Sequence, residues 1–205
     1  MDLGAWDTTI SDLESKDTKR RLRGLDRLAE RLQQQQRQEQ PDNNTQWQTL
    51  VNPLVGTLRD NNFKVCRSVL ACLESLTDQV GNNMTPFLST IIPATVECLG
   101  NSKSAVQDKG IELLLAIAQP NVNGAQCTLA SLEQGGQSFR HKNWRVREQL
   151  MRFLGRAVEV DAAGVCARPA LALAGVLAEA LNDSAEQVRQ QAMVAAGAVV
   201  ELFPG

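Results

Sequence analysis

The sequence is poor in the residue types from which catalytic and metal sites are built. Its 205 residues include one histidine, no tyrosine and only 4% aromatic residues. The cysteines are odd in number and include no Cys-x-x-Cys pair: Cys66, Cys72, Cys98, Cys127 and Cys166. That pattern is typical of neither a disulfide framework nor a zinc site, and it indicates a reducing compartment. Cys127 and His141 form the one conceivable nucleophile pair, but no orienting residue accompanies them. We predict a protein that is not an enzyme and that binds no metal or cofactor.

Long apolar runs are also missing. Residues Met1–Ile10 contain neither a basic start nor an apolar stretch, so they do not resemble a secretory signal. The most apolar run, Pro169–Leu181, is too short to span a bilayer and carries Glu179. With 43% hydrophobic and 21% charged residues, the composition is ordinary for a globular protein. We expect a soluble, cytoplasmic protein without membrane contact.

What the sequence does contain is a repeat. Straight-chain helix formers and alanine dominate, and strand formers never alternate for long with polar residues, so we predict an all-α fold. Four segments share one plan, in which a polar turn is followed by a valine and a helix face. The valines are Val65, Val106, Val146 and Val188, with spacings of 41, 40 and 42 residues. A period of about 40–47 residues with two helices per unit is typical of HEAT repeats.

A fifth, degenerate copy opens the chain, with Ser15–Arg20 as its turn and Leu22, Leu25 and Leu28 as its apolar stripe. One repeat cannot bury its own apolar face, so the copies must stack on one another. We therefore predict a single domain over residues 1–205, an α-solenoid of about five HEAT-like helix pairs. The repeats are expected at residues 1–40, 44–82, 84–120, 123–160 and 161–205.

Individual helices follow from the apolar spacing. The later ones are expected at Val106–Ala118, Thr128–Glu133, Trp144–Val158, Ala170–Leu181 and Glu186–Leu202. Ser102, Asn143 and Ser184 stand beside the short turns and are the expected N-caps. Pro93 falls inside a helical pattern, which predicts a kink there.

Basic charge is concentrated in the turns within the repeats. The five turns, at residues 16–21, 60–64, 100–104, 140–147 and 182–189, together carry a formal charge of +7, although the whole chain carries −2. In a solenoid these turns align along one edge, and a basic edge suits an acidic partner. The candidate partner-binding residues are Lys16, Thr18, Lys19, Asn62, Phe63, Lys64, Lys103, Lys142, Trp144 and Arg145.

Two groups of residues allow a second interpretation. Phe63 and Trp144 are large aromatics beside a turn, and each is either an exposed hot spot or a side chain packed beneath its own turn. Arg67, Arg147 and Arg189 follow the repeat valines closely. In HEAT arrays an arginine there often pairs with an aspartate of the neighbouring turn, so we expect these three to hold repeats in register.

At these turns the sequence resembles a TOG domain, the tubulin-binding HEAT array of microtubule regulators. It is most similar to the N-terminal TOG domain of CLASP, the cytoplasmic linker-associated protein family, and especially to its plant members. The stretches that carry the resemblance are SKDTKRRLRGLDRL, LRDNNFKV, CLGNSKSAV, HKNWRVRE and LNDSAEQVR. The resemblance implies that the turn edge contacts α/β-tubulin. Many tubulin-binding TOG domains carry a tryptophan in the first turn, where this sequence has Thr18.

The resemblance implies a cytoplasmic, microtubule-associated module that recognises tubulin or the microtubule lattice and contributes to microtubule stabilisation and rescue, in the mitotic spindle among other arrays. We expect the isolated domain to be monomeric. Thr18 favours an alternative, a HEAT scaffold that binds a different protein or regulates its own parent chain. The basic edge also leaves nucleic acid open as a partner, although the aromatic platforms of single-strand binders are nearly absent.

Overall fold

The structure is a computed structural model, and it describes residues 4–38, 47–134 and 138–202. The outer ends of the first and last predicted repeats, and the boundary between the first two, lie outside these residues. Within them the chain forms helices and no strand. The elements are α1 (Gly4–Leu13), α2 (Thr18–Gln38), α3 (Gln48–Thr57), α4 (Phe63–Val80), the 3-10 helix η1 (Gly81–Phe87), α5 (Leu88–Leu99), α6 (Ser104–Ile117), α7 (Gly124–Glu133), α8 (Trp144–Val160), α9 (Ala162–Cys166), α10 (Ala170–Leu181) and α11 (Glu186–Val200).

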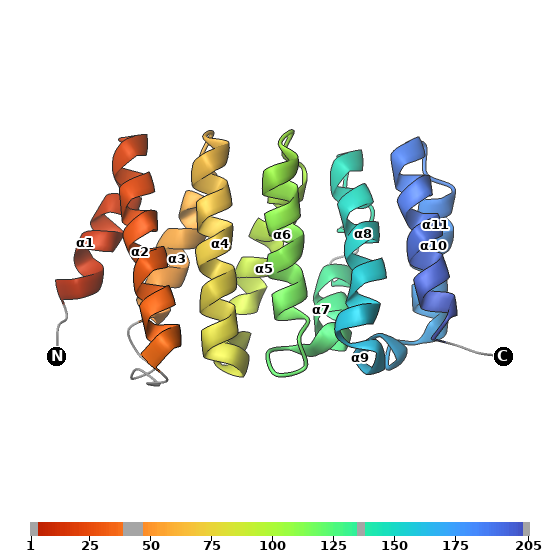
Figure 1. The fold of residues 1–205 in the computed structure, drawn as a ribbon. Helices are drawn as coiled ribbons and strands as arrows, with labels where there is room; N and C mark the ends of the chain where they lie inside the picture. Colours follow the sequence, from red (N-terminus) through yellow and green to blue (C-terminus); the bar gives the residue numbers. More distant parts are fainter. Residues whose placement is uncertain (1–3, 39–46, 135–137, 203–205) are drawn as a thin grey trace.

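The helices stand in two rows. Figure 1 shows α2, α4, α6, α8 and α11 side by side in front, with α1, α3, α5, α7 and α10 behind them. Each front helix packs on the next one along the array. Four of them, α2, α4, α6 and α11, also pack on the rear helix that precedes them, whereas α8 packs on α5 and α9. The predicted all-α solenoid is therefore confirmed. The turns that join each rear helix to its front helix all lie along the upper edge in Figure 1, and we call this the turn edge.

The repeat valines lie at the centre of this arrangement. Val65, Val106, Val146 and Val188 are all 0% exposed. Each is the third residue of its front helix, so the four occupy equivalent places as the spacing predicted. Burying a side chain of this size stabilises the fold by about 1.5–3 kcal/mol. The valines thus anchor the start of each front helix directly below the turn edge.

Several predicted helix boundaries differ from the structure. The helix expected at Thr128 begins at Gly124, and the short α9 was not predicted. Gly124 has a left-handed backbone (φ +74°), which breaks the preceding chain and allows α7 to start there. The carboxylate of Asp161 accepts a hydrogen bond from the Ala125 N–H at 2.9 Å and so caps α7 from 36 residues away. Pro93 lies inside α5, which continues to Leu99.

Candidate partner-binding edge

All five turns of the edge are closed by the same backbone contact. The N–H of the residue just before each front helix donates to the side chain two positions earlier, at 2.7–3.2 Å. The accepting side chains are Ser15, Asp60, Asn101, His141 and Asp183. Short polar side chains that accept from the backbone two residues on are a common way to fix a tight turn. The sequence thus builds one turn five times with different acceptors.

A second contact closes each turn from the other side. The fourth residue of every front helix reaches back and donates to the backbone carbonyl of the accepting residue, at 2.5–3.0 Å. The donors are Arg21, Cys66, Gln107, Arg147 and Arg189. Because both contacts recur, the backbone of every turn is fixed, whatever side chains stand at its tip.

The helix caps follow from this geometry. Asn62 and Asn143 immediately precede α4 and α8, and their side chains accept from the N–H groups of Lys64 and Arg145. The prediction for Asn143 is confirmed. Those for Ser102 and Ser184 are wrong, because the neighbouring Asn101 and Asp183 make the turn contact and no side chain caps α6 or α11.

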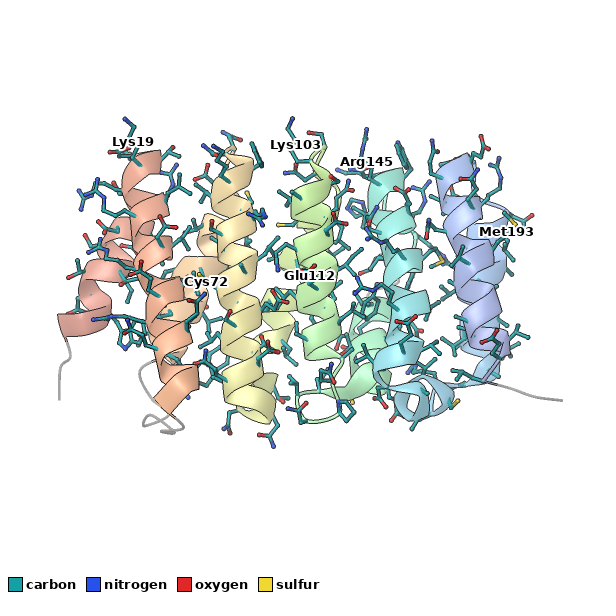
Figure 2. All side chains as sticks on the ribbon, viewed as in Figure 1. Lys19, Cys72, Lys103, Glu112, Arg145 and Met193 are labelled. Carbon is teal, nitrogen blue, oxygen red and sulfur yellow. The ribbon has the colours of Figure 1, made fainter. Side chains whose placement is uncertain are left out.

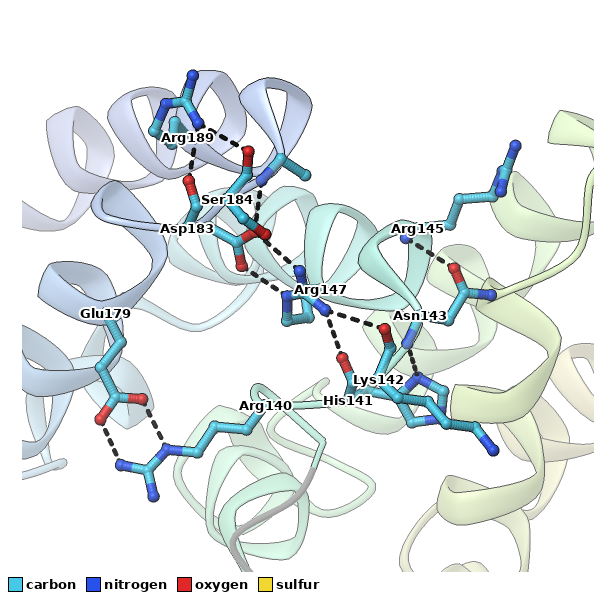
Figure 3. A network of polar contacts seen from close by, with 11 residues as sticks. Arg140, His141, Lys142, Asn143, Arg145, Arg147, Glu179, Asp183, Ser184 and Arg189 are labelled. Atoms are coloured by element: carbon cyan, nitrogen blue, oxygen red, sulfur yellow. Dashed lines mark hydrogen bonds and ion pairs between the residues drawn. The ribbon is translucent and has the colours of Figure 1, made fainter.

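Ion pairs join some neighbouring turns. Arg147 donates to both carboxylate oxygens of Asp183 in the next turn, at 2.6 and 2.8 Å (Figure 3). The hydrogen bond from Arg147 lowers the pKa of Asp183, and the bond to Asp183 raises the pKa of Arg147. Arg21 forms an ion pair with Asp60 through one contact, from its Nε to the Asp60 Oδ2 at 2.6 Å. These arginines therefore hold the first turn to the second and the fourth to the fifth.

The other two arginines expected in this role lie differently. Arg189 donates to the carbonyls of Asp183 and Ser184 in its own turn, and it forms no ion pair with the residues that the structure describes. Arg67 is exposed, and it forms no ion pair within the described part of the chain. Cys66 takes the equivalent place in α4, because Arg67 stands one residue further from the repeat valine than Arg147 or Arg189 does.

In the described part of the chain, no buried ion pair joins the turns in the middle of the edge. The ammonium group of Lys103 lies 5.8 Å from the centroid of the Phe63 ring, which links the second and third turns. The Asn143 amide donates to the Gly100 carbonyl at 3.2 Å, and the His141 ring lies 3.5 Å from the exposed Glu97 carboxylate. His141 is thus engaged in linking the third and fourth turns.

The tips of the turns carry cations of another kind. Lys16, Lys19, Lys64, Lys103 and Lys142 are exposed, and none of them pairs with a carboxylate among the residues that the structure describes. Figure 2 shows Lys19, Lys103 and Arg145 projecting from the same edge. The predicted lysines therefore stand exposed at the turns, with no carboxylate paired to them among the described residues.

The remaining predicted site residues are partly built into the scaffold. The Thr18 hydroxyl is half-buried and accepts from the Arg21 guanidinium at 3.0 Å. Phe63 and Trp144 are half-buried against the core, and Arg145 lies over the Trp144 ring at 4.6 Å. Thr18, Lys19, Phe63 and Lys64 line one shallow depression of about 780 Å³ between the first two turns. The structure thus brings these four candidates together with Asn62, whereas Lys16 lies outside the depression.

Known proteins share this sequence pattern and fold. The sequence profile described as EF3 N-terminal HEAT repeat matches residues 26–196. A CLIP-associated protein of Arabidopsis thaliana is 31% identical over 88% of this chain, and the match covers 12% of that protein. TOG array regulator of axonemal microtubules protein 1 of Mus musculus is 29% identical over 71% of this chain and 8% of its own length. The chain therefore spans a small part of the relatives that it matches.

A solved structure extends the comparison to the fold. The MAST/Orbit N-terminal domain superposes with a TM-score of 0.81 at 19% identity, over 96% of this chain and 84% of that domain. The predicted resemblance to CLASP proteins, and to a plant member in particular, is confirmed by the 31% identity to the Arabidopsis protein, and the superposition shows that the fold is shared. Among the described residues, no helix is long and apolar enough to cross a membrane.

Proposed function

Since the chain belongs to the HEAT-repeat family described as EF3 N-terminal HEAT repeat, and is a TOG-type array similar to CLASP proteins, we propose that it is a microtubule-associated module whose turn edge recognises tubulin. The mouse relative is named as a regulator of axonemal microtubules. We propose the same class of partner here, and with it a cytoplasmic, cytoskeletal location. The domain acts by binding, with no catalytic step, and residues 1–205 act as one monomeric unit.

The observation that supports this proposal is that the cations of the edge are of two kinds, mostly buried arginines in ion pairs and exposed lysines without a carboxylate partner. Arg21 and Arg147 have side chains that are only 16% and 15% exposed, and each forms an ion pair with an aspartate of the neighbouring turn. The five lysines at the tips are exposed and unpaired in the described part of the chain. Holding unpaired like charges along one face has no benefit for folding, but it steers an acidic partner to that face and orients it.

The contribution to microtubule stabilisation and rescue belongs to the parent protein, of which this array is one module. A single module with exposed, solvent-screened contacts binds weakly. Several tethered modules raise the effective concentration of each and so increase the overall affinity. We propose that this array supplies one such contact, so that its own affinity is moderate and its effect on microtubule growth depends on neighbouring modules.

Co-sedimentation with polymerised tubulin, alongside size-exclusion chromatography with free tubulin, tests the proposal. We expect binding that weakens steeply between 50 and 500 mM salt, since at 1 M salt charge interactions are screened within about 3 Å. Binding that does not change with salt would mean that the basic edge is incidental. Duplex DNA is the competitor, and displacement of tubulin by DNA at equal charge concentration would favour a nucleic-acid partner instead.

Thr18 favours one alternative, a HEAT scaffold for a protein other than tubulin. Its hydroxyl accepts a hydrogen bond from Arg21, and threonine supplies no aromatic ring at the position where tubulin-binding TOG domains often carry tryptophan. Absence of binding to both forms of tubulin, with the domain folded, would give this alternative the lead. Thr18→Trp would then be the informative variant, because gain of tubulin binding would locate the missing contact in the first turn.

A further inference from the structure

The two aromatic residues of the edge are both covered by cations. The Lys103 ammonium group lies over the Phe63 ring at 5.8 Å, and the Arg145 guanidinium lies over the Trp144 ring at 4.6 Å. A cation within about 6 Å of a ring centroid is attracted by the negative face of the ring. Each ring therefore has a cation over one of its faces.

The first of these pairs is assembled from two different turns. Phe63 is the first residue of α4, and it is half-buried against the core, so its ring is a fixed platform. Lys103 immediately precedes α6 in the next repeat. Its backbone is held by Asn101, which accepts from the Lys103 N–H at 2.9 Å. Both ends of the contact are thus rigid, and only the lysine side chain is free to move.

The fixed Phe63 ring reduces the conformational entropy that the Lys103 side chain loses when a partner binds. A lysine side chain loses considerable conformational entropy when a partner fixes it, and this loss lowers affinity. A ring beneath the ammonium group restricts that freedom before the partner arrives, while the charge stays available because Lys103 is exposed and has no acidic partner among the described residues. The Phe63 ring therefore restricts the Lys103 side chain in advance, so that binding a carboxylate costs less conformational entropy.

We propose that Phe63 is a positioning residue, which holds Lys103 toward carboxylate groups of the partner instead of contacting the partner itself. This inference rests on the proposed function, since the carboxylates are those of tubulin. On this proposal Phe63 does not add apolar contact area with the partner; it supports the charge of Lys103. Trp144 and Arg145 repeat the arrangement within the fourth turn, so the central part of the edge offers two ring-backed cations.

A double-mutant cycle on microtubule affinity tests the proposal. Phe63→Leu should weaken co-sedimentation by about two- to fivefold, which corresponds to the free energy of an exposed cation–aromatic contact. Lys103→Met should weaken it at least as much, because it also removes the charge that meets the partner. The double variant should bind no more weakly than Lys103→Met alone. Phe63→Trp should keep the wild-type affinity and salt dependence, because the indole ring attracts a cation most strongly among the aromatic side chains. If Phe63→Leu weakens binding equally when Lys103 is already methionine, the ring touches the partner and the proposal is wrong.

Two controls separate positioning from folding. Phe87→Leu removes a half-buried aromatic that contacts Trp47 and stands outside the turns, so it should leave microtubule affinity unchanged. Lys103→Met alters only an exposed side chain and should keep the wild-type melting temperature. A loss of affinity in Phe87→Leu equal to that in Phe63→Leu would mean that general destabilisation, and not Lys103, explains the result.

A measurement without tubulin distinguishes failure of this proposal from failure of the proposed function. In the free domain with reductively methylated lysines, the Lys103 methyl signal should be displaced by the ring current of Phe63. The displacement should disappear in Phe63→Leu and persist in Phe87→Leu. An unchanged Lys103 signal in Phe63→Leu would overturn the platform even if microtubules bind. A displaced signal in a domain that fails to bind tubulin would overturn only the proposed function.

Discussion

The fourth turn, between α7 and α8, and the fifth turn, between α10 and α11, are built alike. In both, a side chain two positions before the helix accepts from the backbone, and an arginine four positions into the helix donates to the carbonyl of that same residue. Their charges nevertheless differ, since residues 140–147 carry +4 and residues 182–189 carry −1. The tip of the fourth turn holds Lys142 and Arg145, where the fifth holds Ser184 and Gln187.

This difference shows that scaffold and surface vary independently in the array. The contacts that close the fourth and fifth turns use backbone groups, one accepting side chain and one arginine, so they do not depend on the residues at the tip. A partner that reads charge would therefore distinguish the fourth turn from the fifth although their backbones match. The comparison predicts two classes of substitution. Those in the contacts that close a turn lower folding stability, and those at the tip lower only the affinity for the partner.

The largest expected effect comes from the arginines that close the two turns. Arg147→Leu removes the pair with Asp183 and leaves that mostly buried carboxylate without a cation, so we expect a loss of about 3 kcal/mol in the free energy of unfolding. Arg189→Leu removes only hydrogen bonds to carbonyls at the surface and should cost about 1 kcal/mol. Urea denaturation measures both. Equal losses would mean that the ion pair between turns adds nothing to the turn contact.

A pH titration of stability isolates the same ion pair with a smaller effect. The hydrogen bond from Arg147 lowers the pKa of Asp183 below its ordinary value in the folded state. A lowered folded-state pKa contributes stability that is present above the unfolded value, about 3.9, and is lost as the pH falls through the folded value. Wild type should therefore lose more stability than Arg147→Leu between pH 5 and pH 2. Parallel pH profiles would contradict the assigned pair.

The smallest expected effect is a gain in affinity when the tip of the fifth turn is given cations, which tests whether the residues at the tip are sufficient for binding. Ser184→Lys with Gln187→Arg gives the fifth turn the cations of the fourth at equivalent, exposed positions. Folding stability should change by no more than about 0.5 kcal/mol. Affinity for microtubules at low salt should rise by about two- to fivefold, the worth of exposed charge pairs. An unchanged affinity would show that the fifth turn lies outside the contact.

Much of the fold could be predicted because its determinants recur at a fixed spacing. The four valines repeat every 40–42 residues and located four of the front helices, and the stripe of Leu22, Leu25 and Leu28 located the first one. The same spacing would have identified Arg21, which stands four residues into its helix as Arg147 and Arg189 do. It was missed because no valine accompanies it. Ser102 and Ser184 were misassigned because the turn contact uses the residue before each serine.

The contacts between repeats could not be read from the sequence. Asp161 caps α7 from 36 residues away, and Lys103 covers Phe63 from the next repeat. Nothing local to either residue indicates its partner, because such contacts depend on how neighbouring repeats stack. The choice between an exposed and a packed Phe63 was therefore open until the ring was seen half-buried beneath a cation.

The most direct test of the account reverses the tip of the fourth turn. Lys142→Glu with Arg145→Glu is compared by microtubule co-sedimentation with Arg23→Glu and Arg156→Glu, a control with the same change in net charge at exposed positions along α2 and α8, outside the turns. We predict at least a tenfold loss of affinity for the first variant, little change for the control, and wild-type melting temperatures for both. Wild-type binding by the folded tip variant would contradict the claim that the turn edge binds tubulin.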